Sequence, residues 1–151
     1  MSQSLTCIYI HLIFHVKTDS VAIKDGDQEK INAYVAGILN NLGCTTVAVG
    51  GIRDHIHMLF GLCPTIGISD LVKKVKTASH KYIETLSPSY RSFAWQSGYG
   101  AFSVSPTTLD KVKNYVLHQR EHHRTKDFNN EYLMLLHLSH IPYDEKYVFS
   151  D

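Results

Sequence analysis

The chain of 151 residues lacks the features that mark several specialised classes of protein. It has only three cysteines, Cys7, Cys44 and Cys63, with no Cys-x-x-Cys pair, which excludes a disulfide-stapled miniprotein and favours buried free thiols in a reducing cytoplasm. No apolar run approaches the roughly 18 residues of a membrane span, and the first residues lack the basic start of a signal peptide. We therefore expect a single domain over residues 1–151, located in the cytoplasm and without a membrane partner.

The chain also lacks an excess of charge of either sign. Lysine and arginine number 15 against 14 aspartates and glutamates, so the net charge is +1 and gives no global signal for a nucleic-acid partner. Two segments are nevertheless basic. Residues 71–83 contain four lysines and no acidic residue, and residues 111–126 contain five basic residues against one acidic residue. Such runs are either solvated helix faces or surfaces that follow phosphates.

Hydrophobic periodicity predicts the order of the secondary structure. Alternation with period two indicates strands, a stripe with helical spacing indicates helices, and Gly50-Gly51 is expected to form a turn between two strands. Ser69 is expected to cap the second helix. The predicted strands span residues 5–16, 44–49, 55–60 and 95–104, and the predicted helices span 27–42, 69–86, a segment from 106 onward, and 130–138.

This order is β-α-β-β-α-β followed by helices, which predicts an α+β fold of the ferredoxin-like (RRM-like) kind. Its antiparallel sheet would carry helices on one face, with a C-terminal tyrosine-bearing helix added. The first and third strands would lie at the centre of the sheet. Because this fold serves many chemistries, function has to be argued from particular side chains.

Histidine is the one unusually abundant residue, with ten copies. Two of them, His55 and His57, lie two apart on a predicted strand, so their side chains project to the same side. Such a pair can supply two neighbouring ligands to a divalent metal and leave positions open for water or substrate. The same pair can equally consist of two hydrogen-bonded polar residues on a half-exposed sheet. Imidazole ligands alone do not identify the metal.

The helix expected after Pro106 carries Tyr115 and Gln119, four residues apart and therefore on one face. A tyrosine can act as a covalent nucleophile if its surroundings position it for attack, and a metal that holds the phosphate would supply the complementary charge. The amide oxygen of Gln119 offers a third ligand. The alternative is that Tyr115 is a packing residue of an amphipathic helix.

Three segments together resemble a known family. Gly50-Gly51-Ile52-Arg53-Asp54-His55-Ile56-His57-Met58-Leu59, the strand-like residues 95–104, and Asn114-Tyr115-Val116-Leu117-His118-Gln119 are similar to the single-tyrosine HUH transposases of the IS200/IS605 family, which include the REP-associated tyrosine transposases. The resemblance runs from about residue 5 to residue 140. Replication-initiator relatives often carry a second tyrosine four residues after the first. That position is Gln119 here, which favours the one-tyrosine branch.

The resemblance implies a small dimeric enzyme that cuts and rejoins single-stranded DNA with hairpin ends. His55, His57 and Gln119 would hold Mg²⁺ or Mn²⁺, and Tyr115 would attack the phosphodiester to form a 5′-phosphotyrosine and a free 3′-hydroxyl. The tyrosine helix can complete the partner subunit's site in this family, so Tyr115 need not lie near its own histidine pair. Residues expected to contact DNA are Lys73, Lys74, Lys76, Lys81, Lys113, Arg120, His122 and Arg124.

Two other functions fit the same sequence. One is a DNA-binding protein derived from such a transposase, catalytically silent or adapted to a host task. The other is a metal-dependent hydrolase of small phosphoesters, which would need neither a tyrosine nor strand joining. A covalent adduct with DNA separates the transposase from both.

Overall fold

The computed structural model describes residues 2–119 and 127–150. Its order of strands and helices is the predicted one, with two short 3₁₀ helices added at Pro88–Ser92 and Pro106–Thr108. The elements are β1 (Tyr9–His15), α1 (Asp25–Asn41), β2 (Thr45–Ile52), β3 (His55–Gly61), α2 (Ile68–Leu86), β4 (Gly100–Val104), α3 (Leu109–Leu117) and α5 (Phe128–Leu138).

The four strands form one antiparallel sheet in the order β2-β3-β1-β4, so β1 and β3 are central as expected. Both faces of these two strands are largely apolar, which suits strands that are covered on both sides. Residues 10–14 of β1 and 55–60 of β3 are all buried. The ferredoxin-like α+β fold predicted from periodicity is confirmed.

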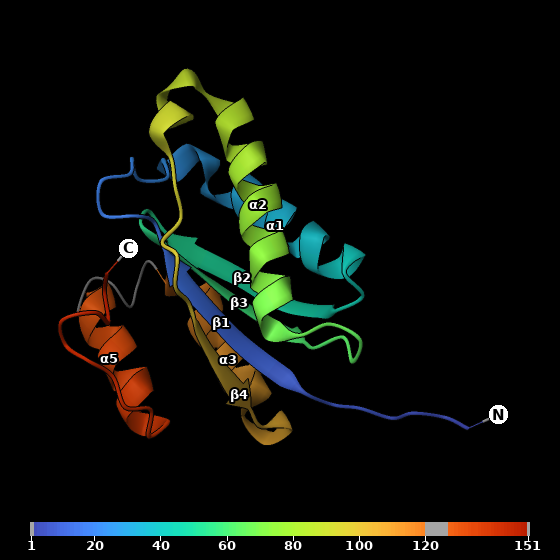
Figure 1. The fold of residues 1–151 in the computed structure, drawn as a ribbon. Coiled ribbons are helices and arrows are strands. Elements are labelled where there is room, and N and C mark those ends of the chain that lie inside the picture. The colour runs from blue at the N-terminus through green and yellow to red at the C-terminus, as the bar shows by residue number, and fades with distance from the viewer. Residues whose placement is uncertain (1, 120–126, 151) are drawn as a thin grey trace.

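Helices cover both faces of the sheet (Figure 1). On one face, α1 and α2 pack over the main core, in which Phe14, Ile56 and Phe60 of the strands meet Val35 and Val75 of the helices. On the other face, α3 packs over β2 and β3 through a smaller cluster. Helix α5 packs over β1 and β4 through Phe128, Tyr132 and Leu136. The tyrosine-bearing helix and the last helix therefore share the face opposite α1 and α2.

Three local predictions are wrong. Gly50-Gly51 belongs to β2, and the turn lies at residues 53–54, where Arg53 adopts a φ of 52°. Ser69 lies inside α2, whose N-cap is Gly67. The last strand begins at Gly100 rather than residue 95, because Trp95 forms only an isolated antiparallel bridge with Val16. Between the two, the carbonyl oxygens of Gln96 and Gly98 accept hydrogen bonds from Lys76 Nζ at 2.7 Å.

The cysteine prediction is correct only in part. All three thiols are free, but Cys7 is exposed, whereas Cys44 is buried and Cys63 is partly buried. Cys7 precedes the first residue of β1, so it lies where the chain has not yet entered the sheet.

Gly50 allows α3 to lie close against β2. A Cβ atom at this position would overlap the carbonyl oxygen of Val116, which is backbone and cannot rotate away. We expect Gly50→Ala to destabilise the protein by about 1–3 kcal/mol, because α3 must shift. The matched control is Gly37→Ala, where nothing lies within 4 Å of the added methyl group. This helical substitution should instead stabilise by about 0.5–1 kcal/mol. Chemical unfolding of both variants checks the pair, and equal stabilities would contradict the expected close approach.

Within the described residues, none of the helices has the length and apolar character required to cross a membrane.

Candidate active site

The two central strands place the histidine pair on the face covered by α3 and α5. In the β1–β3 register, His15 lies opposite His55 and Ile13 opposite His57, so these side chains share a face. His55 and His57 are both completely buried, with ring centres 5.2 Å apart. Their common direction follows from their two-residue spacing, as the sequence indicated.

In each imidazole of the pair, the Nδ1 atom contacts a neighbouring side chain and the Nε2 atom faces a side-chain oxygen atom. His55 Nδ1 is 2.8 Å from Asp54 Oδ1, and His55 Nε2 is 3.3 Å from Gln119 Oε1. His57 Nε2 is 2.9 Å from Glu131 Oε1. Two Nε2 atoms that face oxygen donors in a buried space form an arrangement able to hold a divalent cation.

Gln119 lies just beyond His118, the C-cap of α3, so the helix expected to carry it ends before it. Its side chain is almost completely buried. Its Nε2 atom donates a hydrogen bond to the carbonyl oxygen of Tyr115 at 2.9 Å. This bond turns the amide so that the Oε1 atom faces His55. The four-residue spacing from Tyr115 to Gln119 therefore directs an oxygen ligand into the site.

Tyr115 of α3 lies beside the histidine pair of its own chain. Its ring meets the ring of His57 edge to face, with ring centres 5.8 Å apart, and meets the ring of His11 in the same way at 6.2 Å. Burial raises the pKa of the Tyr115 phenol, and the hydrogen bond and negative charge of Glu131 raise it further. The phenol is therefore protonated at neutral pH in this arrangement.

Glu131, in the first turn of α5, is a member of the site that sequence reasoning missed. It is 4% exposed, and one oxygen of its carboxylate lies within 4.8 Å of the ligand nitrogens of His55 and His57. Burial alone would raise the pKa of Glu131, but its interactions with His57 outweigh burial and lower the pKa to about 2. The sequence does contain one indication that Glu131 is unusual. Apart from histidine, it is the only acidic or basic residue between Phe128 and Leu138.

His11 is the other member that sequence reasoning left without a role. It lies on β1, is 4% exposed, and its Nε2 atom is 2.8 Å from His57 Nδ1. Burial is the main cause that lowers the pKa of His11 to about 3, with a further contribution from the charge of His57, so this ring is neutral at physiological pH.

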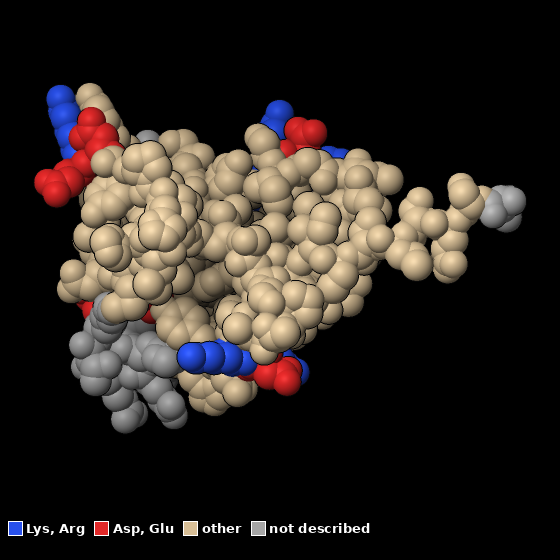
Figure 2. Space-filling view, turned by 90° about the horizontal axis from the view of Figure 1, so that it is seen from below, with Lys and Arg blue, Asp and Glu red and all other residues tan. Residues whose placement is uncertain are grey.

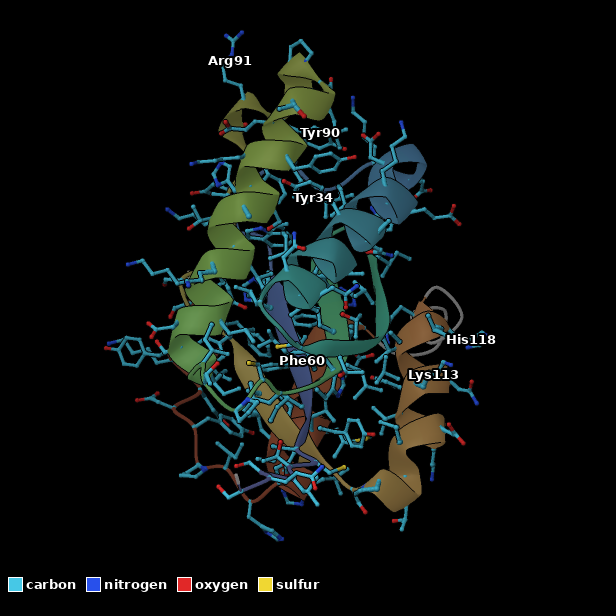
Figure 3. The ribbon with its side chains drawn as sticks, turned by 90° about the vertical axis from the view of Figure 1, so that its right-hand side faces the viewer. Tyr34, Phe60, Tyr90, Arg91, Lys113 and His118 are labelled. Atoms are coloured by element: carbon cyan, nitrogen blue, oxygen red, sulfur yellow. The ribbon has the colours of Figure 1, made fainter. Side chains whose placement is uncertain are left out.

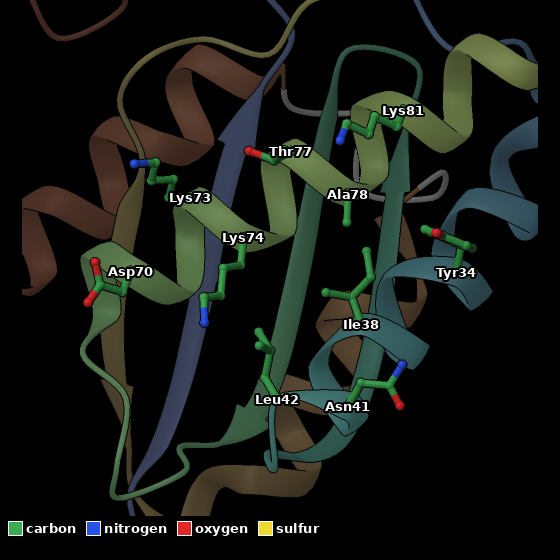
Figure 4. Close-up of a pocket in the computed structure, with 10 residues that line it drawn as sticks. All are labelled: Tyr34, Ile38, Asn41, Leu42, Asp70, Lys73, Lys74, Thr77, Ala78 and Lys81. Atoms are coloured by element: carbon green, nitrogen blue, oxygen red, sulfur yellow. The ribbon is translucent and has the colours of Figure 1, made fainter.

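The basic residues expected at a DNA surface do not lie together. Lys73, Lys74 and Lys81 line a groove of about 870 Å³ between α1 and α2, on the face of the sheet opposite the histidine pair (Figure 4). Lys76 is bonded to two backbone carbonyl oxygens, and burial lowers its pKa to about 8. Lys113 is exposed on α3 (Figure 3). Three further residues, Arg120, His122 and Arg124, lie outside the described residues.

The surface seen from below in Figure 2 carries few charged side chains, and these lie near its margin. Five side chains of the candidate site are buried, so it is an enclosed polar cluster: His11, His55, His57, Gln119 and Glu131. The structure thus brings together Tyr115, His55, His57 and Gln119, and it separates them from the α2 lysines by the thickness of the sheet.

A ferredoxin-like sheet that carries a histidine pair beside a tyrosine-bearing helix defines the class of single-tyrosine transposases. The family described as "Transposase IS200 like" matches residues 4–119, and the chain belongs to this family. Membership in a transposase family implies a DNA-cleaving activity.

Individual relatives agree with this assignment. The ISDra2 transposase TnpA of Deinococcus radiodurans is 23% identical over 116 residues, which cover 74% of this chain and 83% of that protein. The fold is similar to a crystal structure of a protein assigned as a transposase from Deinococcus radiodurans R1, with a TM-score of 0.60, 23% identity, and coverage of 77% of this chain and 95% of that chain. It is also similar to a REP-associated tyrosine transposase bound to a REP hairpin, with a TM-score of 0.55, 9% identity, and coverage of 77% and 70%.

Proposed function

We propose that this protein is a transposase that cleaves and rejoins single-stranded DNA through a covalent 5′-phosphotyrosine intermediate. The observation that carries the proposal is the position of Tyr115, whose ring lies 5.8 Å from the ring of His57 in a buried cluster of metal-ligating side chains. A tyrosine that only packed a helix against a sheet would not require two imidazoles and an amide oxygen to converge beside it.

The side chains of the cluster fit a divalent metal ion. His55 and His57 offer imidazole nitrogens, while Gln119 and Glu131 offer the oxygen atoms that Mg²⁺ and Mn²⁺ prefer. The proposed ligands are His55, His57 and Gln119. When bound, the ion would neutralise charge on the phosphate oxygens and orient the scissile bond.

In the proposed cleavage, the Tyr115 oxygen attacks phosphorus as the bond from phosphorus to the 3′ oxygen breaks. The tyrosine becomes joined to the 5′ phosphate and the electron pair of the broken bond stays on the 3′ oxygen. Overall, the proton lost by the phenol is taken up by that oxygen, which is released as a hydroxyl. The Glu131 carboxylate accepts a hydrogen bond from the phenol and so orients the Tyr115 oxygen. A second 3′-hydroxyl reverses the attack, and strand joining follows because the phosphotyrosine conserves the energy of the broken bond.

The DNA substrate is proposed to be single-stranded with hairpin ends, and the enzyme to act as a cytoplasmic homodimer. Support for the hairpin comes from the fold shared with a REP-associated tyrosine transposase whose structure contains a REP hairpin. Within one chain, Tyr115 already lies beside His57, so the described residues bring the tyrosine and the histidine pair together without a partner subunit.

Covalent trapping tests the proposal. The purified protein is incubated with 5′- or 3′-labelled single-stranded hairpin DNA and Mn²⁺, then denatured and resolved by electrophoresis. We expect a protein–DNA adduct in which the label 3′ to the cut is attached to Tyr115. A DNA-binding protein without chemistry would shift the DNA in a native gel and form no adduct. A hydrolase of small phosphoesters would cleave a chromogenic phosphodiester and form none.

The α2 lysines provide an independent test of the DNA surface. The double substitution of Lys73→Glu and Lys74→Glu should weaken binding of the hairpin DNA and reduce the slope of log K against log salt by about 1 to 2, because two phosphate contacts are lost. The control is Lys17→Glu with Lys146→Glu, which makes the same change of charge at two exposed residues outside α2. If both pairs have the same salt slope as the unmodified protein, the DNA lies elsewhere.

A further inference from the structure

His11 is a buried polar side chain that the proposed cleavage does not use. We propose that His11 positions His57 for metal binding, by accepting a hydrogen bond from His57 Nδ1 and so leaving the Nε2 atom of His57 without a proton and directed into the site. The inference rests on the proposed function, because it assumes that His57 binds the metal. It assigns to a residue of β1 the task of holding a ligand that β3 supplies.

The strand register places His11 within direct reach of His57. His11 lies opposite Leu59, and Ile13 lies opposite His57, so His11 and His57 are diagonal neighbours on one face of the two central strands. Both backbones are fixed by the sheet ladder, and both side chains are buried. The contact therefore joins two rigid elements and has no mobile loop on either side.

The geometry of the two rings is that of a hydrogen bond between nitrogens. His11 Nε2 and His57 Nδ1 are 2.8 Å apart, while the ring centres are 5.1 Å apart and the ring planes differ by 26°. The rings thus meet edge to edge. By contrast, His55 and Phe128 have centres 4.5 Å apart at 29°, which is a closer face-to-face approach.

The contact is informative for a His57 ring that binds a metal through Nε2, because such a ring keeps a single proton, on Nδ1. If Nδ1 carries the proton and donates it to His11, the lone pair at Nε2 is available to a metal. That Nε2 atom is the one located 2.9 Å from Glu131 Oε1, inside the cluster. Without a metal, this distance to an ionised carboxylate favours a proton on Nε2, and a metal bound at Nε2 would replace that proton. The bond to His11 would then hold the orientation of the ring and keep its remaining proton on Nδ1.

His55 has an equivalent arrangement. Its Nδ1 atom is 2.8 Å from Asp54 Oδ1, and its Nε2 atom faces Gln119 Oε1. Metal-ligating histidines usually donate their second N–H to a carboxylate or a carbonyl oxygen, and Asp54 fits that rule. His11 supplies a neutral acceptor for the second histidine. It holds His57 without adding another negative charge beside Glu131.

Two substitutions of His11 separate its role as an acceptor from its role in packing. His11→Leu removes the acceptor and keeps an apolar side chain, whereas His11→Gln keeps an oxygen that can accept from His57 Nδ1. We expect the Leu variant to bind Mn²⁺ about 10- to 100-fold more weakly in titration calorimetry, as for other residues that orient metal ligands. The Gln variant should recover most of the affinity. Wild-type affinity in the Leu variant, or equal losses in both variants, would overturn the inference.

His15→Leu is the matched control, because His15 lies on the same strand and the same face. Its Nδ1 atom is 2.6 Å from the carbonyl oxygen of Val16 instead of a metal-facing histidine. Its Mn²⁺ affinity should stay close to that of the wild type, and a loss as large as that of His11→Leu would contradict the specific role. If the unmodified protein binds no Mn²⁺, the proposed function fails together with this inference. If it binds Mn²⁺ and the Leu variant binds equally well, only the role of His11 fails.

A measurement on the unmodified protein covers the case in which His11→Leu does not fold. In ¹⁵N NMR spectra recorded with Mg²⁺, the imidazole proton of His57 should be on Nδ1, and His11 Nε2 should carry none. A proton found on His11 Nε2 would overturn the inference, because His11 would then be the donor.

Discussion

Phenylalanine in place of Tyr115 should abolish strand cleavage and the covalent adduct while leaving hairpin DNA binding near normal. The substitution removes one oxygen atom and retains the ring, whose edge-to-face contacts with His57 and His11 hold it in place. Loss of an attacking nucleophile typically costs orders of magnitude, so we expect cleavage to fall by roughly 10⁴-fold or more. Labelled DNA on a denaturing gel measures both the cleavage and the adduct.

The control for this experiment is Tyr99→Phe, which removes the same atom from an exposed tyrosine outside the cluster. It should form the adduct as the wild type does. An adduct that persists in Tyr115→Phe would show that another residue is the nucleophile, and loss of DNA binding in that variant would show that the phenol serves binding and not chemistry.

The second large effect is expected from loss of the metal site. His57→Ala removes the imidazole whose Nε2 atom faces Glu131, and we expect both Mn²⁺ affinity and cleavage to fall by more than roughly 100-fold. Because the substitution also leaves a buried carboxylate without this partner, it should lower stability by about 3–5 kcal/mol, so circular dichroism is needed to establish the folded state.

Chelation separates the metal effect from the stability effect. EDTA should stop cleavage by the unmodified protein, and added Mg²⁺ or Mn²⁺ should restore it. The matched substitution is His80→Ala, where a partly exposed histidine on α2 pairs with Glu84 at 2.7 Å and lies away from the cluster. It should retain cleavage. Undiminished cleavage in EDTA would exclude a metal-dependent reaction.

The parts of the structure that follow from local pattern could be predicted from the sequence. Two-residue spacing predicts the common direction of His55 and His57. The helix expected to carry both Tyr115 and Gln119 ends at Leu117, and Gln119 reaches the carbonyl oxygen of Tyr115 from beyond the C-cap. The central positions of β1 and β3 follow from the β-α-β-β-α-β order of the elements. These predictions depend only on the period of a strand and on the order of the elements.

The parts that depend on contacts between distant elements could not be predicted. Glu131 reaches the site only because α5 docks on β1 and β4, and nothing in the sequence near Glu131 specifies that docking. His11 belongs to the site because of the β1–β3 register, which a single strand does not reveal. The composition of Gly50-Gly51 predicts a turn, although Gly50 is required where the backbone of α3 approaches β2.

The docking of α5 also has a consequence for the order in which the protein is made. The cluster combines His11 from β1, the histidine pair from β3, Tyr115 from α3 and Glu131 from α5. Synthesis proceeds from the N-terminus, so the sheet and the tyrosine emerge from the ribosome before the carboxylate does. The cluster therefore cannot be complete until α5, the last of these four elements, has been translated and has docked on the sheet.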